Sequence, residues 1–163
     1  MPQNPLTEDN RELYDAFIAK LLNPFTPTEE LREMYMKPVP PRIGQIQCTI
    51  TRHKGGMNRF WPKYTLSLSA TNQFLLTGKK RAGNTTSNYM ISMDQEKVGK
   101  QGSGYLGKVR SNFLGTEFSI YDNGANPDKA KTPEAVRCQH GVVQYETNVL
   151  GSKGPRRMKV LLP

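Results

Sequence analysis

The stretch Gln45-Ile46-Gln47-Cys48-Thr49-Ile50-Thr51 decides the fold class. Polar and apolar side chains alternate along it, which is the period of a β-strand with one buried face. Similar short runs recur further on, and we expect strands at residues 64–69, 73–77, 88–93, 105–111, 117–122, 142–145 and 159–162. Turn residues separate the runs, as in Gly55-Gly56 and Asp122-Asn123-Gly124. This pattern predicts antiparallel β-structure, either a barrel or a sandwich.

The segment before residue 43 has the period of a helix instead. Leu13, Phe17 and Leu21 recur four residues apart, and Asn23-Pro24 ends this predicted helix. Residues 26–29, Thr-Pro-Thr-Glu, have the pattern of a capping box, which predicts a second short helix to about Met36. We therefore expect a helical segment over residues 1–36, a stiff Pro-rich linker over 37–42 and a β domain over 43–163.

The composition indicates a negatively charged partner but does not identify its class. The chain has 163 residues and a formal net charge of +9, and its mean hydropathy of −0.65 is low for a compact domain. An excess of cations attracts polyanions, which include nucleic acid, acidic lipid and acidic protein. The sequence has no apolar run of membrane-spanning length and no signal-peptide core, so we expect any membrane contact to be peripheral and the protein to be cytoplasmic.

Catalytic chemistry is poorly supported by the sequence. His53 and His140 have no serine, cysteine or carboxylate at a telling spacing, and His53 reads as part of a solvated turn. Cys48 and Cys138 lie far apart without a CxxC motif, which indicates buried or idle thiols in a reducing compartment. We predict that the chain is not an enzyme and uses no cofactor or metal.

The basic residues are more informative than the histidines. Lys79-Lys80-Arg81 follows an apolar run, and strand geometry would place Lys79 and Arg81 on one face and Lys80 on the other. Lys108 and Arg110 repeat the same spacing on a second predicted strand. Two cations on one face of a strand can bind neighbouring phosphates, although charge alone favours a solvated basic face.

Several longer blocks of this sequence resemble the tubby-like proteins, in the order in which that family has them. They cover roughly Ile46 to the C-terminus and are the segments 74–81 (FLLTGKKR), 86–92 (TSNYMIS), 107–116 (GKVRSNFLGT), 121–124 (YDNG) and 145–158 (YETNVLGSKGPRRM). The resemblance implies a closed antiparallel barrel around a hydrophobic C-terminal helix. It also implies a ligand, phosphatidylinositol 4,5-bisphosphate, at the cytosolic leaflet of the plasma membrane.

The headgroup contacts of the family map onto particular residues here. They are Lys79, Lys80, Arg81 and Arg110, with Asn58 as a weaker candidate. The resemblance further implies adaptor work, in which membrane-protein cargo is carried, including into cilia, and it leaves movement to the nucleus open. A nucleic-acid-binding transcriptional regulator is the alternative.

Two departures from the family pattern affect these expectations. The basic run of the family continues where this chain has Ala82-Gly83-Asn84-Thr85, and each lost cation weakens attraction to an anionic surface by about 1 kcal/mol. The sequence also stops at Leu161-Leu162-Pro163, before the last strands and the central helix of the family domain. We therefore expect a mainly β fold with N-terminal helices, a tubby-type barrel without those elements. The first helix is a candidate substitute for the central one.

Overall fold

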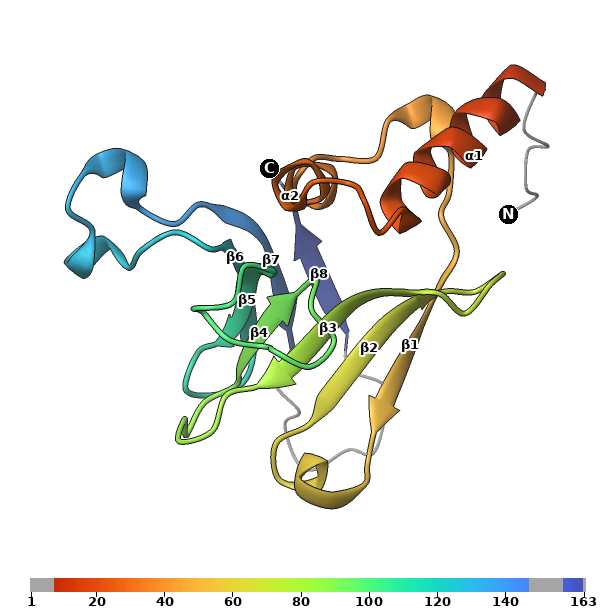
Figure 1. The fold of residues 1–163 in the computed structure, drawn as a ribbon. Coiled ribbons are helices and arrows are strands. Elements are labelled where there is room, and N and C mark those ends of the chain that lie inside the picture. The colour runs from red at the N-terminus through yellow and green to blue at the C-terminus, as the bar shows by residue number, and fades with distance from the viewer. Residues whose placement is uncertain (1–7, 147–156, 163) are drawn as a thin grey trace.

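The computed structural model describes residues 8–146 and 157–162. Two helices precede eight strands, and all eight strands belong to one sheet (Figure 1). The helices are α1 (Glu8–Leu22) and α2 (Thr28–Met36). The strands are β1 (Cys48–His53), β2 (Lys63–Leu68), β3 (Phe74–Lys80), β4 (Asn88–Ser92), β5 (Tyr105–Ser111), β6 (Glu117–Asp122), β7 (Gln139–Tyr145) and β8 (Met158–Leu161).

Each strand pairs antiparallel with the next one along the chain, in the order β1 to β8. The sheet is strongly curved, and it is not closed within the described residues, because β1 and β8 remain its two edges (Figure 1). Both edges expose apolar side chains, with Ile50 69% exposed and Met158 61% exposed. The mainly β fold with N-terminal helices is therefore confirmed, with the sheet as an open part of a tubby-type barrel.

The helices cover the end of the sheet where β2 turns into β3. Leu21 of α1 is buried against Leu68 and Leu75, and further apolar side chains of both helices pack around this cluster. The Tyr35 hydroxyl of α2 donates to the Leu75 carbonyl at 3.1 Å. The Arg32 guanidinium donates to the carbonyls of Tyr105 and Ser103, both at 2.6 Å. α1 lies across this end of the sheet in Figure 1, not along the strands as a central helix would.

The expected capping box at the start of α2 is wrong. Pro27 occupies the N-cap position, and no side chain caps the helix there. The Thr26 hydroxyl instead donates to the Lys20 carbonyl at 2.7 Å, so it satisfies one of the free carbonyls at the end of α1. Proline wins the cap position because its fixed φ suits the entry to a helix and it has no N–H to satisfy.

Candidate anion-binding site

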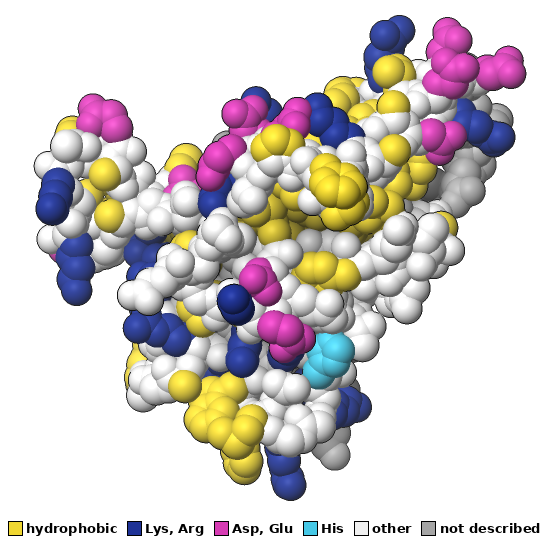
Figure 2. Space-filling model, in the orientation of Figure 1, with side chains coloured by type: hydrophobic (Ala, Val, Ile, Leu, Met, Phe, Trp, Pro, Cys, Tyr) yellow, Lys and Arg dark blue, Asp and Glu magenta, His cyan; other side chains and the backbone are white. Residues whose placement is uncertain are grey.

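A cavity of about 400 Å³ in the middle of the sheet is lined mainly by basic side chains. It lies between the turn from β3 to β4, strand β5 and the long connection from β6 to β7. Its lining consists of Arg81, Asn84, Asn88, Lys100, Lys108, Arg110, Ala125, Asn126, Lys129 and Arg137. Six of these residues are cationic and none is acidic. Figure 2 shows Lys and Arg side chains gathered on and below the connection that projects at the left of the view.

Strand register places three of the lining residues in one row. The Arg81 amide donates to the Asn88 carbonyl at 2.8 Å, and Asn88 lies directly opposite Arg110 on β5. Residues that face each other in an antiparallel pair project from the same side of the sheet. Arg81, Asn88 and Arg110 therefore share one face, and Lys108 joins them because it is two residues before Arg110.

Lys108 is the most deeply buried cation of the cavity, at 6% exposure. Burial, the largest cause, and the nearby charges of Arg137, Lys100 and Arg110 together lower its pKa to about 8, while Asp122 opposes them. The Nε atom of Arg110 is buried and has no hydrogen-bond partner among the described residues. A buried charged donor without an acceptor is costly, and an anion in the cavity would satisfy it.

The β6–β7 connection is held in place by Asp122 at its start. One carboxylate oxygen of Asp122 accepts from the backbone amides of Gly124 at 2.9 Å and Cys138 at 3.0 Å, which ties the two ends of the connection together. Only glycine fits at position 124, because a Cβ there would lie 2.4 Å from the Cα of Arg137. Arg137 stacks over the Tyr121 ring at 4.3 Å, and this contact fixes its guanidinium at the cavity wall.

Comparison with known proteins identifies the family of this chain. The Tub family model matches residues 35–163. The chain belongs to the tubby family. It is 48% identical over 138 residues to Tubby-related protein 2 of Mus musculus, covering 80% of this chain and 25% of that protein. It is 47% identical over 124 residues to Tubby protein homolog 1 of Caenorhabditis briggsae, covering 72% and 29%, respectively. Tubby-related protein 1 of Homo sapiens is 41% identical over 145 residues, covering 86% and 27%.

The chain thus spans between a quarter and a third of the length of these tubby relatives. The tubby family is a family of non-enzymatic domains, and the absence of enzymatic activity in this chain stays a prediction. In the part of the chain that the structure describes, no three His, Cys, Asp or Glu side chains are grouped to hold a metal. None of the described helices is long and apolar enough to cross a bilayer.

The structure separates the five site residues that the tubby resemblance predicts. Arg81 and Arg110 line the cavity together. Lys79 lies opposite Met90 on the same face of the sheet but does not line the cavity, and Lys80 lies opposite Tyr89 on the other face. Asn58 belongs to the short 3₁₀ helix η2 (Gly56–Arg59), in the connection between β1 and β2. Whether these residues bind a ligand stays a prediction.

Four cations of the cavity were not among the predicted site residues. The sequence does point to Lys108, because it is two residues from Arg110, the same spacing as between Lys79 and Arg81. Lys100, Lys129 and Arg137 come from the connections after β4 and β6, and no local pattern marks them. They reach the cavity only because those connections fold back over β5.

The histidines and cysteines lie outside this cavity. The expectation that His53 lies in a solvated turn is wrong. His53 is the last residue of β1, and its Nε2 lies 3.0 Å from the Thr65 hydroxyl. His140 belongs to β7, with its Nε2 4.0 Å from an Asp122 oxygen. Cys48 and Cys138 are both free and exposed, so they are not buried, and of the expected buried or idle thiols the idle, unpaired alternative stays.

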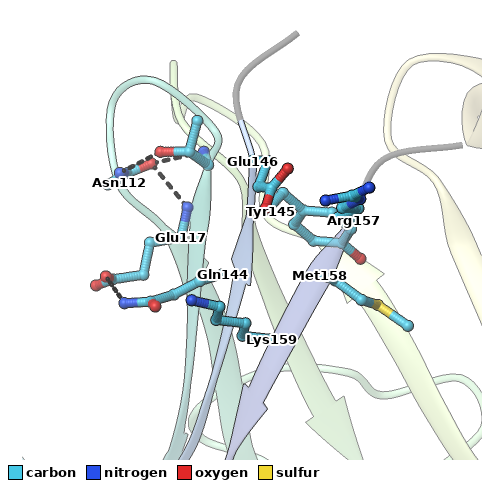
Figure 3. A pocket seen from close by; sticks show the side chains of 9 residues that line it. Asn112, Glu117, Gln144, Tyr145, Glu146, Arg157, Met158 and Lys159 are labelled. Atoms are coloured by element: carbon cyan, nitrogen blue, oxygen red, sulfur yellow. Dashed lines mark hydrogen bonds between the residues drawn. The ribbon is translucent and has the colours of Figure 1, made fainter. Parts of the chain in front are cut away.

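A larger hollow of about 680 Å³ lies between β6, β7 and β8 (Figure 3). Its lining carries two carboxylates, Glu117 and Glu146, and two cations, Arg157 and Lys159. Glu117 already accepts a hydrogen bond from the Gln144 amide at 3.1 Å. Charges of both signs and satisfied polar groups give this hollow no preference for an anion, so the basic cavity is the stronger candidate.

Proposed function

We propose that this tubby-family chain binds the headgroup of phosphatidylinositol 4,5-bisphosphate in the basic cavity. The contact tethers the protein to the cytosolic face of a membrane, at the plasma membrane or in the cilium. There it serves as an adaptor for membrane-protein cargo. The ligand is not enzymatically changed in this proposal, and no cofactor takes part.

The charge of the cavity is the observation that carries the proposal. Six cations line it without one carboxylate, and a buried donor of Arg110 has no acceptor. Phosphomonoester groups supply both the missing negative charge and several acceptor oxygens. Arginine forks suit such groups, because their planar donors can bind two oxygens at once. The cavity volume is also within the range of about 300–1,000 Å³ that is usual for small-ligand sites.

Vesicle binding tests the proposal directly. Phosphatidylcholine vesicles with a few per cent phosphatidylinositol 4,5-bisphosphate are sedimented with the wild-type chain and with Arg81→Ala/Arg110→Ala. A hydrogen bond between charged groups is worth about 1.5–3 kcal/mol, so each substitution should weaken binding about tenfold or more. Near-UV circular dichroism checks that the double variant is folded.

Lys80→Ala is the matched control, because it removes a neighbouring charge from the opposite face of the sheet. It should weaken binding by at most about fivefold, the effect of one cation near an anionic surface. Equal losses for Lys80→Ala and Arg81→Ala would mean that only net charge matters and that the cavity is not the site. Undiminished binding by the arginine double variant would also end the proposal.

Nucleic acid remains the alternative ligand, because its backbone phosphates attract the same cations. Duplex DNA is therefore added as a competitor at fixed salt. We expect soluble inositol 1,4,5-trisphosphate to displace the chain from vesicles well below the phosphate concentration that DNA needs. Stronger competition by DNA than by the inositol phosphate would favour the nucleic-acid function. Cleavage of the lipid by phospholipase C should release the bound chain, since the headgroup leaves the membrane.

A further inference from the structure

Three connections that the structure describes in full lie at the same end of the sheet, because the strands follow one another in an antiparallel meander. They join β1 to β2 (residues 54–62), β3 to β4 (81–87) and β5 to β6 (112–116), and Figure 1 shows them at the lower end, away from the helices. None of the three contains an aspartate or glutamate, whereas Lys54, Arg59 and Arg81 lie in them. These three connections define a basic end of the sheet, although Glu117 at the start of β6 and Glu146 after the end of β7 also lie there.

The opposite end has a different composition. The connections from β4 to β5 and from β6 to β7 contain four carboxylates, namely Asp94, Glu96, Asp128 and Glu134. The connection from β2 to β3 is short and polar, and the two helices cover this end. The three connections thus carry positive charge alone, whereas the connections at the other end carry charges of both signs.

Large apolar side chains are exposed on the basic end. Phe113 and Leu114, in the turn between β5 and β6, are 86% and 76% exposed. Met57 and Phe60, in the connection between β1 and β2, are 66% and 68% exposed. Figure 2 shows hydrophobic side chains at the lower end of the view, where the connection from β1 to β2 lies. Their exposure is unfavourable in water, and clusters of this kind mark contact surfaces.

The turn that carries Phe113 and Leu114 is held rigidly. The Asn112 side chain accepts from the amides of Thr116 at 3.0 Å and Glu117 at 3.3 Å, and it donates to the Thr116 hydroxyl at 3.0 Å. Gly115 completes the turn with a φ of +67°, which glycine adopts without strain. The two apolar side chains are thus displayed at a fixed tip, so contact with a partner costs little ordering entropy.

The tip also adjoins the basic cavity. Arg110 of the cavity is two residues before Asn112, and the Ser111 amide donates to the Ser87 carbonyl of the neighbouring connection at 2.9 Å. Arg81 and Asn84 belong to that connection between β3 and β4, and both line the cavity. A headgroup held there would bring the Phe113-Leu114 tip against the lipid that carries it.

We propose that Phe113 and Leu114 insert into the acyl-chain boundary of an anionic bilayer, with Met57 and Phe60 as a second contact. This inference rests on the proposed headgroup function. An anionic bilayer is the partner that fits, because it offers an apolar interior beneath a negative surface, and the basic end of the sheet presents the complementary pattern. The cavity would select the lipid, and the apolar tips would hold the protein on its membrane.

Phe113→Ser/Leu114→Ser separates the two contributions. Its affinity for soluble inositol 1,4,5-trisphosphate, measured by calorimetry, should equal that of the wild-type chain. Its affinity for vesicles with phosphatidylinositol 4,5-bisphosphate should fall at least tenfold. Phe25→Ser is the matched control, since Phe25 is 89% exposed in the loop between the helices at the other end. It should change neither affinity.

A second variant reports insertion directly. Phe113→Trp is made in a Trp61→Phe background, which leaves one tryptophan at the tip. Vesicles with bromine on the acyl chains should quench its fluorescence, and bromine-free vesicles should shift its emission to shorter wavelength. Undiminished vesicle binding by the serine variant, or an unquenched tryptophan at position 113, would overturn the insertion while headgroup binding stood. A wild-type chain that binds neither inositol phosphate nor vesicles would refute both proposals together.

Discussion

Lys108→Met should stabilise the fold and weaken anion binding at the same time. Methionine is close to lysine in length and has no charge to bury. The fall in the pKa of Lys108 from 10.5 to about 8 corresponds to about 3 kcal/mol, at about 1.4 kcal/mol for each pKa unit. The cavity is open to water, which screens part of this cost, so we expect a gain of about 1–2 kcal/mol in the free energy of unfolding at pH 7.

The gain should depend on pH in a definite direction. Lys108 has a lower pKa in the folded chain than in the unfolded chain, where it is near 10.4. Below pH 8 both states carry the proton, and the wild-type chain bears the full cost of the buried charge. Between about pH 8 and pH 10.4 the unfolded state binds more protons, so wild-type stability rises with pH. The advantage of Lys108→Met should therefore shrink between pH 7 and pH 10.

Urea denaturation at pH 7 and pH 9.5, followed by circular dichroism, measures this difference. Lys79→Met is the matched control, because Lys79 lies on the same sheet face outside the cavity and is less buried. It should change stability by a few tenths of a kcal/mol at both pH values. The reasoning is refuted if Lys108→Met is less stable than the wild-type chain at pH 7, or if its advantage is the same at both pH values.

Three further substitutions test the framework of the cavity and the core. Asp122→Ala removes the acceptor of two backbone amides and should cost about 1–3 kcal/mol in urea denaturation, whereas Asp122→Asn keeps an acceptor and should cost less. Gly124→Ala forces a Cβ against the Arg137 backbone and should cost about 1–3 kcal/mol, with faster proteolysis of the β6–β7 connection than in the wild-type chain. Leu21→Ala empties the cluster beneath the helices and should cost about 2–5 kcal/mol; a thermal midpoint like that of the wild-type chain would contradict the packing of α1 on the sheet.

The β-structure was readable from the sequence because alternation is a local signal. The runs at 105–111 and 117–122 match β5 and β6 in the structure. β3 extends to Lys80, beyond the predicted end at Thr77, because pairing with β2 and β4 continues through its lysines. β7 starts at Gln139 instead of Val142, since the ladder with β6 begins with polar residues that carry no apolar period.

Only about half of the basic cavity could be predicted from the sequence, for a physical reason. Arg81 and Arg110 lie on neighbouring positions of the ladder, so strand alternation and register place them together. Arg137 arrives through a connection whose return depends on the Asp122 carboxylate and on the absence of a side chain at Gly124. The return of this connection depends on tertiary contacts. The residues that it places at the cavity therefore have no sequence spacing from which their position could be predicted.

The backbone pairing of β5 explains why the fold tolerates the charges of the cavity. Lys108 and Arg110 are held by the ladder between β4 and β6, and that ladder does not depend on their charge. The sheet can therefore support a group of cations that repel one another, at a cost in stability that an anion removes. An anion that binds the folded chain alone stabilises it, so ligand affinity and resistance to unfolding must rise together. Lys108→Met should separate the two, because it should raise the free energy of unfolding while it lowers the affinity for the anion.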